Sequence, residues 1–121
     1  MAFPGTYNFN YYAGDTFEFF IYPKNSSGGV FDDLNGYTPN FIIATARGSA
    51  SAAVLSSEDA LELLATVEDG EYVSCTILPD GGRQLAGTTY LYDVEIINDE
   101  TGKVFTLLTG TITVTQDVAR I

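Results

Sequence analysis

The sequence contains no histidine, no tryptophan and one cysteine, and only five of its 121 residues are basic. Histidine is the commonest general base and metal ligand near neutral pH, and nucleophilic triads usually place a base beside serine or cysteine. Its absence disfavours most catalytic mechanisms, so we expect a non-enzymatic protein with no cofactor and no metal ion. One cysteine cannot form an internal disulfide. Cys75 lies in the apolar run 72–77, which predicts a buried structural thiol.

Charge and hydropathy limit the partners that the chain can bind. Sixteen acidic residues against five basic ones give a formal net charge of -11, which repels phosphate backbones and anionic lipids. No apolar run approaches the roughly 18 residues of a membrane helix, and the first residues lack the features of a secretory signal. We therefore expect neither nucleic acid nor a membrane as a partner. The acidity fits either solubility or a basic docking partner.

The dominant hydrophobic period is two, which is the period of a strand with one buried face. In the clearest example, Tyr90, Tyr92, Val94 and Ile96 are expected to point inward. Similar alternation predicts strands at residues 7–11, 17–22, 72–77 and 109–115, and the apolar run 41–44 is a further candidate strand. Turn residues predict hairpins at Asp69-Gly70 and at 98–102.

Turn signals recur about every ten residues with no long helix between them, which is typical of an antiparallel sandwich. We predict an all-β, antiparallel, immunoglobulin-like β-sandwich. It is expected to form a single domain over residues 1–121, with a short N-terminal arm over residues 1–6. Residues 57–64 combine serine, acidic residues and leucines, so at most one or two helical turns are expected there.

Several groups of polar residues resemble sites but have simpler structural interpretations. Loop 98–102 gathers oxygen atoms and a glycine, yet it lacks the ligand spacing of an EF-hand, so a hairpin turn is favoured over a calcium site. The acidic pairs at 32–33 and 58–59 are expected to be solvated or to cap a helix. A paired-carboxylate glycosidase is the remaining enzyme hypothesis, because acidic residues are plentiful.

Four segments occur in an order that resembles a known family. They are AGDTF from Ala13, DLNGYT from Asp33, GTTYLYDV from Gly87, and LLTGTITV from Leu107 followed by DVAR from Asp117. Together they resemble small β-sandwich structural proteins of tailed bacteriophages, which include tail-collar and long-tail-fibre attachment proteins and are similar to the N-terminal domain of baseplate upper proteins. The sequence departs from that pattern at Asn35 and Ala119, where threonine is expected.

The resemblance implies a virion structural protein that assembles in the host cytoplasm and has no enzymatic role. Its expected partners are tail, collar, baseplate or capsid subunits and copies of itself, arranged as a symmetric adaptor or fibre attachment on the tail. A capsid cement or decoration protein is the first alternative. A carbohydrate-binding module is the second, and exposed aromatic side chains would be its mark.

Docking is expected through open sheet edges, where unpaired backbone groups can bond to a partner strand. The candidate edges are the first strand, around Tyr7–Tyr11, and the last strand, around Thr113–Asp117. Alternate threonines of the last strand are expected on a solvated or partner-covered face. The candidate interface residues are Phe3, Tyr7, Phe9, Tyr11, Thr111, Thr113, Thr115 and Asp117.

Overall fold

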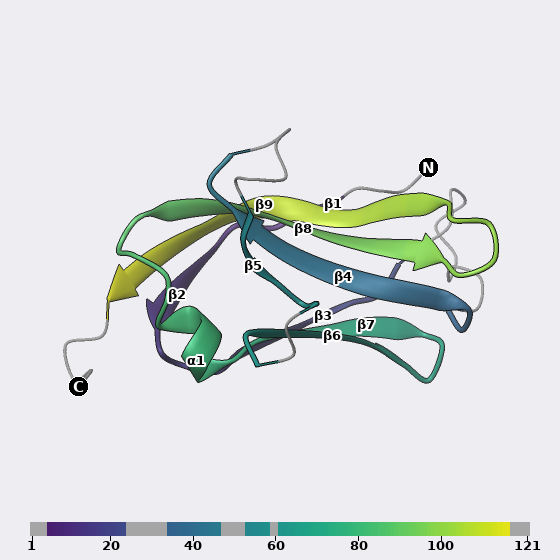
Figure 1. Cartoon of the computed structure of the whole chain (residues 1–121), viewed down its shortest axis with the longest axis horizontal. Helices are drawn as coiled ribbons and strands as arrows, with labels where there is room; N and C mark the ends of the chain where they lie inside the picture. Colours follow the sequence, from purple (N-terminus) through teal and green to yellow (C-terminus); the bar gives the residue numbers. More distant parts are fainter. Residues whose placement is uncertain (1–4, 24–33, 47–52, 59–60, 117–121) are drawn as a thin grey trace.

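The chain folds into two β-sheets that pack face to face (Figure 1). The computed structural model describes residues 5–23, 34–46, 53–58 and 61–116. The larger sheet contains β1 (Gly5–Thr6), β2 (Phe9–Ala13), β4 (Tyr37–Ala44), β5 (Ala53–Ser56), β8 (Thr89–Asn98) and β9 (Val104–Gln116). The smaller sheet contains β3 (Phe17–Ile21), β6 (Leu63–Glu68) and β7 (Tyr72–Ile77).

The strand order is that of an immunoglobulin-like sandwich. In the larger sheet the order is β1-β9-β8-β4-β5, with β2 also on β9, and in the smaller sheet it is β3-β7-β6. The larger sheet follows the order of strands G, F, C and C′ of a variable-type domain, with β9, β8, β4 and β5 in those places. The smaller sheet follows the order of strands B, E and D, with β3, β7 and β6 in those places. The predicted all-β, immunoglobulin-like sandwich is confirmed.

The N-terminal strands depart from the prediction of a purely antiparallel sandwich. β1 and β2 pair with β9 in parallel, with Gly5 opposite Leu108 and Phe9 opposite Ile112. The backbone at Tyr7 approaches β9 closely at Gly110, where a Cβ atom would overlap the carbonyl oxygen of Tyr7. Gly5 and Thr6, which were expected in an arm over residues 1–6, form a paired strand. Residues 1–4 lie outside the described residues.

Three aromatic rings form the centre of the core between the sheets. Phe19 on β3, Phe41 on β4 and Tyr92 on β8 have ring centroids 5.5 to 6.1 Å apart, at steep interplanar angles. Antibody domains place a tryptophan of strand C and a disulfide between strands B and F in this region. A chain with one cysteine and no tryptophan fills the same space with edge-to-face aromatic packing. Tyr90, Tyr92, Val94 and Ile96 are buried, as predicted.

The helical turn lies elsewhere than expected. The described part of the chain has one short helix, α1 (Pro79–Gly82), whereas the described residues of 57–64 form turns and the start of β6. Leu63 is fully buried and pairs with Ile77, while Leu61 is 75% exposed. Cross-strand pairing thus overrides the helix preference of the leucines, and Pro79 at the first position suits α1.

Both predicted hairpins are confirmed, whereas β5 was not predicted. Asp69 and Gly70 have positive φ angles of 55° and 68° in the turn between β6 and β7. In the turn between β8 and β9, the Asn98 side-chain oxygen accepts hydrogen bonds of 2.9 Å from the amides of Glu100 and Thr101. That oxygen closes the turn, as the hairpin interpretation of loop 98–102 predicts. β5 was missed because its four residues, with the sequence AVLS, are too few to show an alternating pattern.

Candidate interaction surface

The predicted N-terminal edge is an edge of the larger sheet, but most of its aromatic side chains point into the core. Within the described residues β2 pairs only with β9, so no described strand lies along its other side. Phe9 and Tyr11 are buried, and their assignment as interface side chains is wrong because the alternation turns them inward. Tyr7 is 44% exposed. Tyr12, which is not among the predicted interface residues, is 59% exposed on the outer face.

The predicted C-terminal edge is wrong over its described residues. β9 lies between β8 and the N-terminal strands, and Thr113 pairs with both Asn10 and Thr89. The N-terminal strands β1 and β2 pair along the side of β9 that was predicted to be an open edge. Thr113 and Thr115 are exposed on the outer sheet face and Thr111 is partly exposed, as the threonine row predicted. Phe3 and Asp117 lie outside the described residues.

Among the described strands, the smaller sheet ends at β3. In an immunoglobulin domain of the constant type, strand A lies beside strand B in this sheet. Here the described N-terminal strands both pair with β9 instead, and within the described ranges β3 pairs only with β7. The outer side of β3 therefore presents backbone groups that no described strand pairs.

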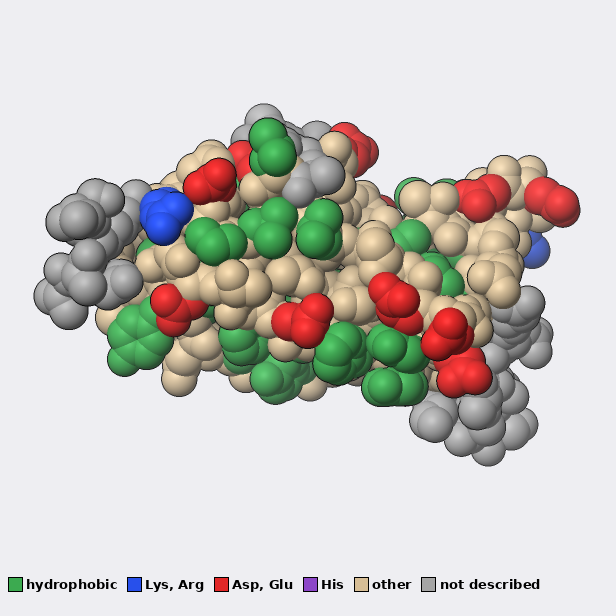
Figure 2. Space-filling model, turned by 90° about the horizontal axis from the view of Figure 1, so that it is seen from below, with side chains coloured by type: hydrophobic (Ala, Val, Ile, Leu, Met, Phe, Trp, Pro, Cys, Tyr) green, Lys and Arg blue, Asp and Glu red, His purple; other side chains and the backbone are tan. Residues whose placement is uncertain are grey.

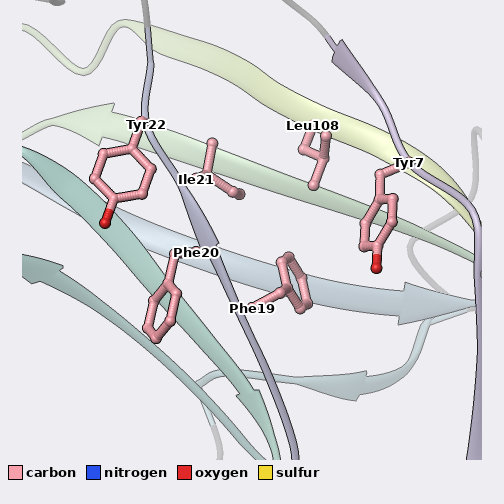
Figure 3. Close-up of a pocket in the computed structure, with 6 residues that line it drawn as sticks. All are labelled: Tyr7, Phe19, Phe20, Ile21, Tyr22 and Leu108. Atoms are coloured by element: carbon pink, nitrogen blue, oxygen red, sulfur yellow. The ribbon is translucent and has the colours of Figure 1, made fainter.

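A shallow groove lies along this edge. It encloses about 410 Å³ and is lined by Tyr7, Phe19, Phe20, Ile21, Tyr22 and Leu108. Figure 3 shows that Phe19 and Ile21 project from one side of β3 toward Tyr7 and Leu108, whereas Phe20 and Tyr22 project from the other side. We call this feature the β3 groove. Its apolar walls and open strand edge are the features that strand addition uses.

The outer face of the smaller sheet carries an exposed aromatic cluster. Phe20 and Tyr22 are 51% and 57% exposed. The Tyr22 and Tyr72 rings stack with centroids 4.8 Å apart, and Phe20 meets Tyr72 edge-to-face at 5.6 Å. We call these three residues the aromatic face. The smaller sheet forms the lower layer in Figure 1, so Figure 2, seen from below, shows its outer face with hydrophobic and acidic side chains interspersed.

The aromatic face could have been found from the sequence. Alternation in the predicted strand 17–22 puts Phe17, Phe19 and Ile21 on one face, so Phe20 and Tyr22 lie on the opposite face. Large exposed aromatic residues at successive outward positions are unusual in a solvated strand. Tyr72 adds to them through the β3-β7 pairing, which sequence alone did not specify.

The pKa values of Cys75 in the core and of Tyr72 on the surface are both raised. Burial raises the pKa of the Cys75 thiol to about 12, so the thiol is protonated and unreactive at neutral pH, as predicted. The pKa of Tyr72 is also raised, through local desolvation and then through Tyr22 and the carboxylates of Glu68, Asp69 and Glu18. These three carboxylates therefore lie close enough to act on the aromatic face.

Within ranges 5–23, 34–46, 53–58 and 61–116, no three histidine, cysteine, aspartate or glutamate residues group as a metal site would require. Among the described helices, none has the length and hydropathy needed to cross a bilayer.

Comparison with known proteins gives similarity of shape only. No family model and no curated protein sequence matches the chain. Among solved structures, the ZIG-8–RIG-5 IG1-IG1 heterodimer is similar at 12% identity and a TM-score of 0.44, covering 95% of this chain and 87% of that one. A family 123 glycoside hydrolase from Clostridium perfringens is similar at 15% identity and a TM-score of 0.40, covering 97% of this chain and 24% of the hydrolase. Neither similarity carries a functional argument. The strand order itself defines the class, an immunoglobulin-like β-sandwich.

Proposed function

We propose that this chain is a non-enzymatic structural adaptor of a bacteriophage virion, which docks a neighbouring subunit at the β3 groove. The sequence resemblance supplies the virion assignment, and the surface supplies the mode of docking. The adaptor acts in several symmetric copies on the tail, at the collar, the baseplate or a fibre junction.

The observation that carries the docking mode is the uncovered β3 edge beside an apolar groove. An extended partner segment can add as a strand to β3, with its backbone bonded to the edge and its side chains in the groove. Monomeric proteins usually protect such edges with charges, prolines or covering loops, because open edges aggregate. Phe17–Ile21 carries one charge, Glu18, and four large apolar residues.

The chemistry of the described residues also favours binding over catalysis. The only cysteine is buried and protonated, and the chain has no histidine to act as a base. The exposed side chains of the β3 groove are apolar or phenolic. Such a surface supplies area for association and no group suited to proton transfer near pH 7.

Size-exclusion chromatography with light scattering tests this function. The purified chain is measured alone and with tail and capsid proteins from the same genome. A complex or ring with a tail component is the expected result. Binding only to assembled capsids would reassign the chain as a cement or decoration protein, and binding to neither would contradict the virion role.

Two groove variants and one control localise the contact. Ile21→Lys places a charge beside the open edge, and Tyr7→Ala removes a side chain that is 44% exposed. Both are expected to abolish or strongly weaken the complex while circular dichroism stays unchanged. Thr113→Lys adds the same charge on the exposed face of the other sheet and should bind normally. Equal binding by all variants would exclude the β3 groove.

A carbohydrate-binding module is a second candidate, favoured by the exposed tyrosines. Tyr12 and Tyr22 are 59% and 57% exposed, and planar rings of this kind stack on sugars. A glycan array discriminates the two functions. Saturable binding that Tyr22→Ala abolishes would favour the module, whereas an empty array together with a tail complex would favour the adaptor.

A further inference from the structure

The aromatic face forms an ordered grid with acidic residues. Cross-strand register places Phe20 opposite Ser74, and Tyr72 opposite Glu68. Glu18 lies two residues from Phe20 on the same strand, and therefore on the same face. The central positions of the grid are small, because Ser74 and Thr76 occupy β7 between the larger side chains.

The carboxylates of this grid are not neutralised by the part of the chain that the structure describes. The ion pair recorded there joins Arg83 to Asp80, at 3.2 Å, outside the grid. Glu68 accepts a hydrogen bond of 2.9 Å from the Thr66 hydroxyl, which holds its carboxylate on the outer face. Glu68, Asp69 and Glu18 also raise the pKa of Tyr72, so their negative field reaches the stacked rings.

We propose that the aromatic face binds an arginine-bearing extended segment of a partner protein, with a guanidinium group stacked on the Tyr22–Tyr72 pair and bonded to Glu68, the cross-strand neighbour of Tyr72. A guanidinium is planar, stacks on aromatic faces and bonds to carboxylates in a fixed geometry, which a lysine ammonium does not match. Opposite charge on the partner also increases the rate of encounter with this acidic chain.

Charge complementarity excludes a second copy as the occupant. The chain carries 16 acidic and five basic residues, so two copies repel at an acidic face. The inference deepens the proposed function by naming the partner's chemistry, and it rests on that function only for the partner's origin. Binding of a basic segment here does not require that the β3 groove be occupied.

The test is isothermal titration of the full chain with an alternating Arg-Ser octapeptide, at low and at moderate salt. We expect saturable 1:1 binding that weakens as salt rises, and weaker binding of the matching Lys-Ser peptide. Tyr22→Ala and Tyr72→Ala should each lower the affinity by about two- to five-fold, the range expected for an exposed cation-π contact. Tyr72→Phe keeps the ring and should bind normally. Glu68→Gln should weaken binding without altering the fold.

Matched controls separate this site from general attraction to a negative protein. Tyr12→Ala removes an equally exposed tyrosine from the other sheet, and Glu100→Gln removes a surface carboxylate of the β8-β9 turn. Neither should change the affinity. Equal weakening by Glu100→Gln and Glu68→Gln would overturn the proposal. Unchanged binding in both Tyr22→Ala and Tyr72→Ala would also overturn it. Peptide binding that persists in Ile21→Lys, when the tail complex is lost, would show that the two sites act separately. A tail complex that survives Ile21→Lys would contradict the β3 groove and leave this site unaffected.

Discussion

The Tyr92 hydroxyl on β8 donates a 2.6 Å hydrogen bond to the backbone carbonyl oxygen of Tyr7, 85 residues earlier in the chain. Tyr92 is also the cross-strand partner of Gly110, whose missing side chain lets Tyr7 approach. The amide of Tyr7 in turn donates to the carbonyl of Thr109 at 3.0 Å. One buried tyrosine and one glycine thus fix the N-terminal segment against β9, and β3 is left with β7 as its one partner among the described strands.

Tyr92→Phe tests the contribution of that hydrogen bond to stability. Removing the hydroxyl leaves a partly buried carbonyl short of a donor, so we expect the free energy of unfolding to fall by about 1 to 3 kcal/mol. Urea denaturation measures it. Tyr12→Phe, which removes an exposed hydroxyl, is the control and should stay within about 0.5 kcal/mol. Equal effects of the two changes would contradict the role of the bond.

Gly110→Ala tests the close approach of Tyr7 to β9. The added methyl group would overlap the Tyr7 carbonyl, so the N-terminal strand must shift, at a cost of about 1 to 3 kcal/mol. Hydrogen exchange should show faster exchange of the Tyr7 amide. A Cβ at Gly87 would lie 3.6 Å from its nearest neighbour, so Gly87→Ala should be nearly neutral. An unchanged Tyr7 amide in Gly110→Ala would refute this account of the pairing.

Cys75 supplies a single-site probe of folding and its pH dependence. The native thiol has a pKa of about 12, against about 8.5 when unfolded. Between these values the unfolded state has lost the proton that the native state keeps, so this group lowers stability as pH rises through that window. Urea midpoints should fall from pH 8 to pH 11, and less steeply in Cys75→Ala.

Labelling with a thiol reagent at pH 8 gives an independent measurement. The native chain should react only as fast as it unfolds, and denaturant should release full reactivity. Rapid labelling of the native chain would show that the thiol is accessible and would contradict its burial. Because the chain has one cysteine, no other thiol can complicate the result.

Local sequence patterns predicted most strands and the hairpins. Which strands pair with one another depended on contacts between residues distant in sequence. Alternation in Tyr90–Ile96 correctly assigned the buried side because it depends only on neighbouring residues. The parallel pairing of the N-terminus with β9 was missed, since it depends on Gly110 and Tyr92 acting on Tyr7 across the chain. That pairing covers the edge of β9 with the N-terminal strands, which is why the predicted C-terminal edge proved to be paired.

Helix preference misled the prediction at one site for a related reason. Leu63 and Leu64 favour a helix locally, but β7 pairs with them and buries Leu63. The four residues of α1 contain two glycines, which disfavour helix in isolation. They are needed there because a Cβ at Gly82 would overlap the Tyr11 hydroxyl, and one at Gly81 would overlap the backbone of Glu62. Tertiary contact therefore decides both segments.

The most direct test of the docking mode is amide hydrogen exchange of the chain alone and bound to its tail partner. If a partner strand adds at the open edge, the outward amides of Phe17–Ile21 should exchange quickly in the unbound chain and slowly in the complex. Amides in the centre of β9 should be protected in both states, because strands flank it on both sides. A stable complex that leaves the β3 amides unprotected would contradict docking at this edge.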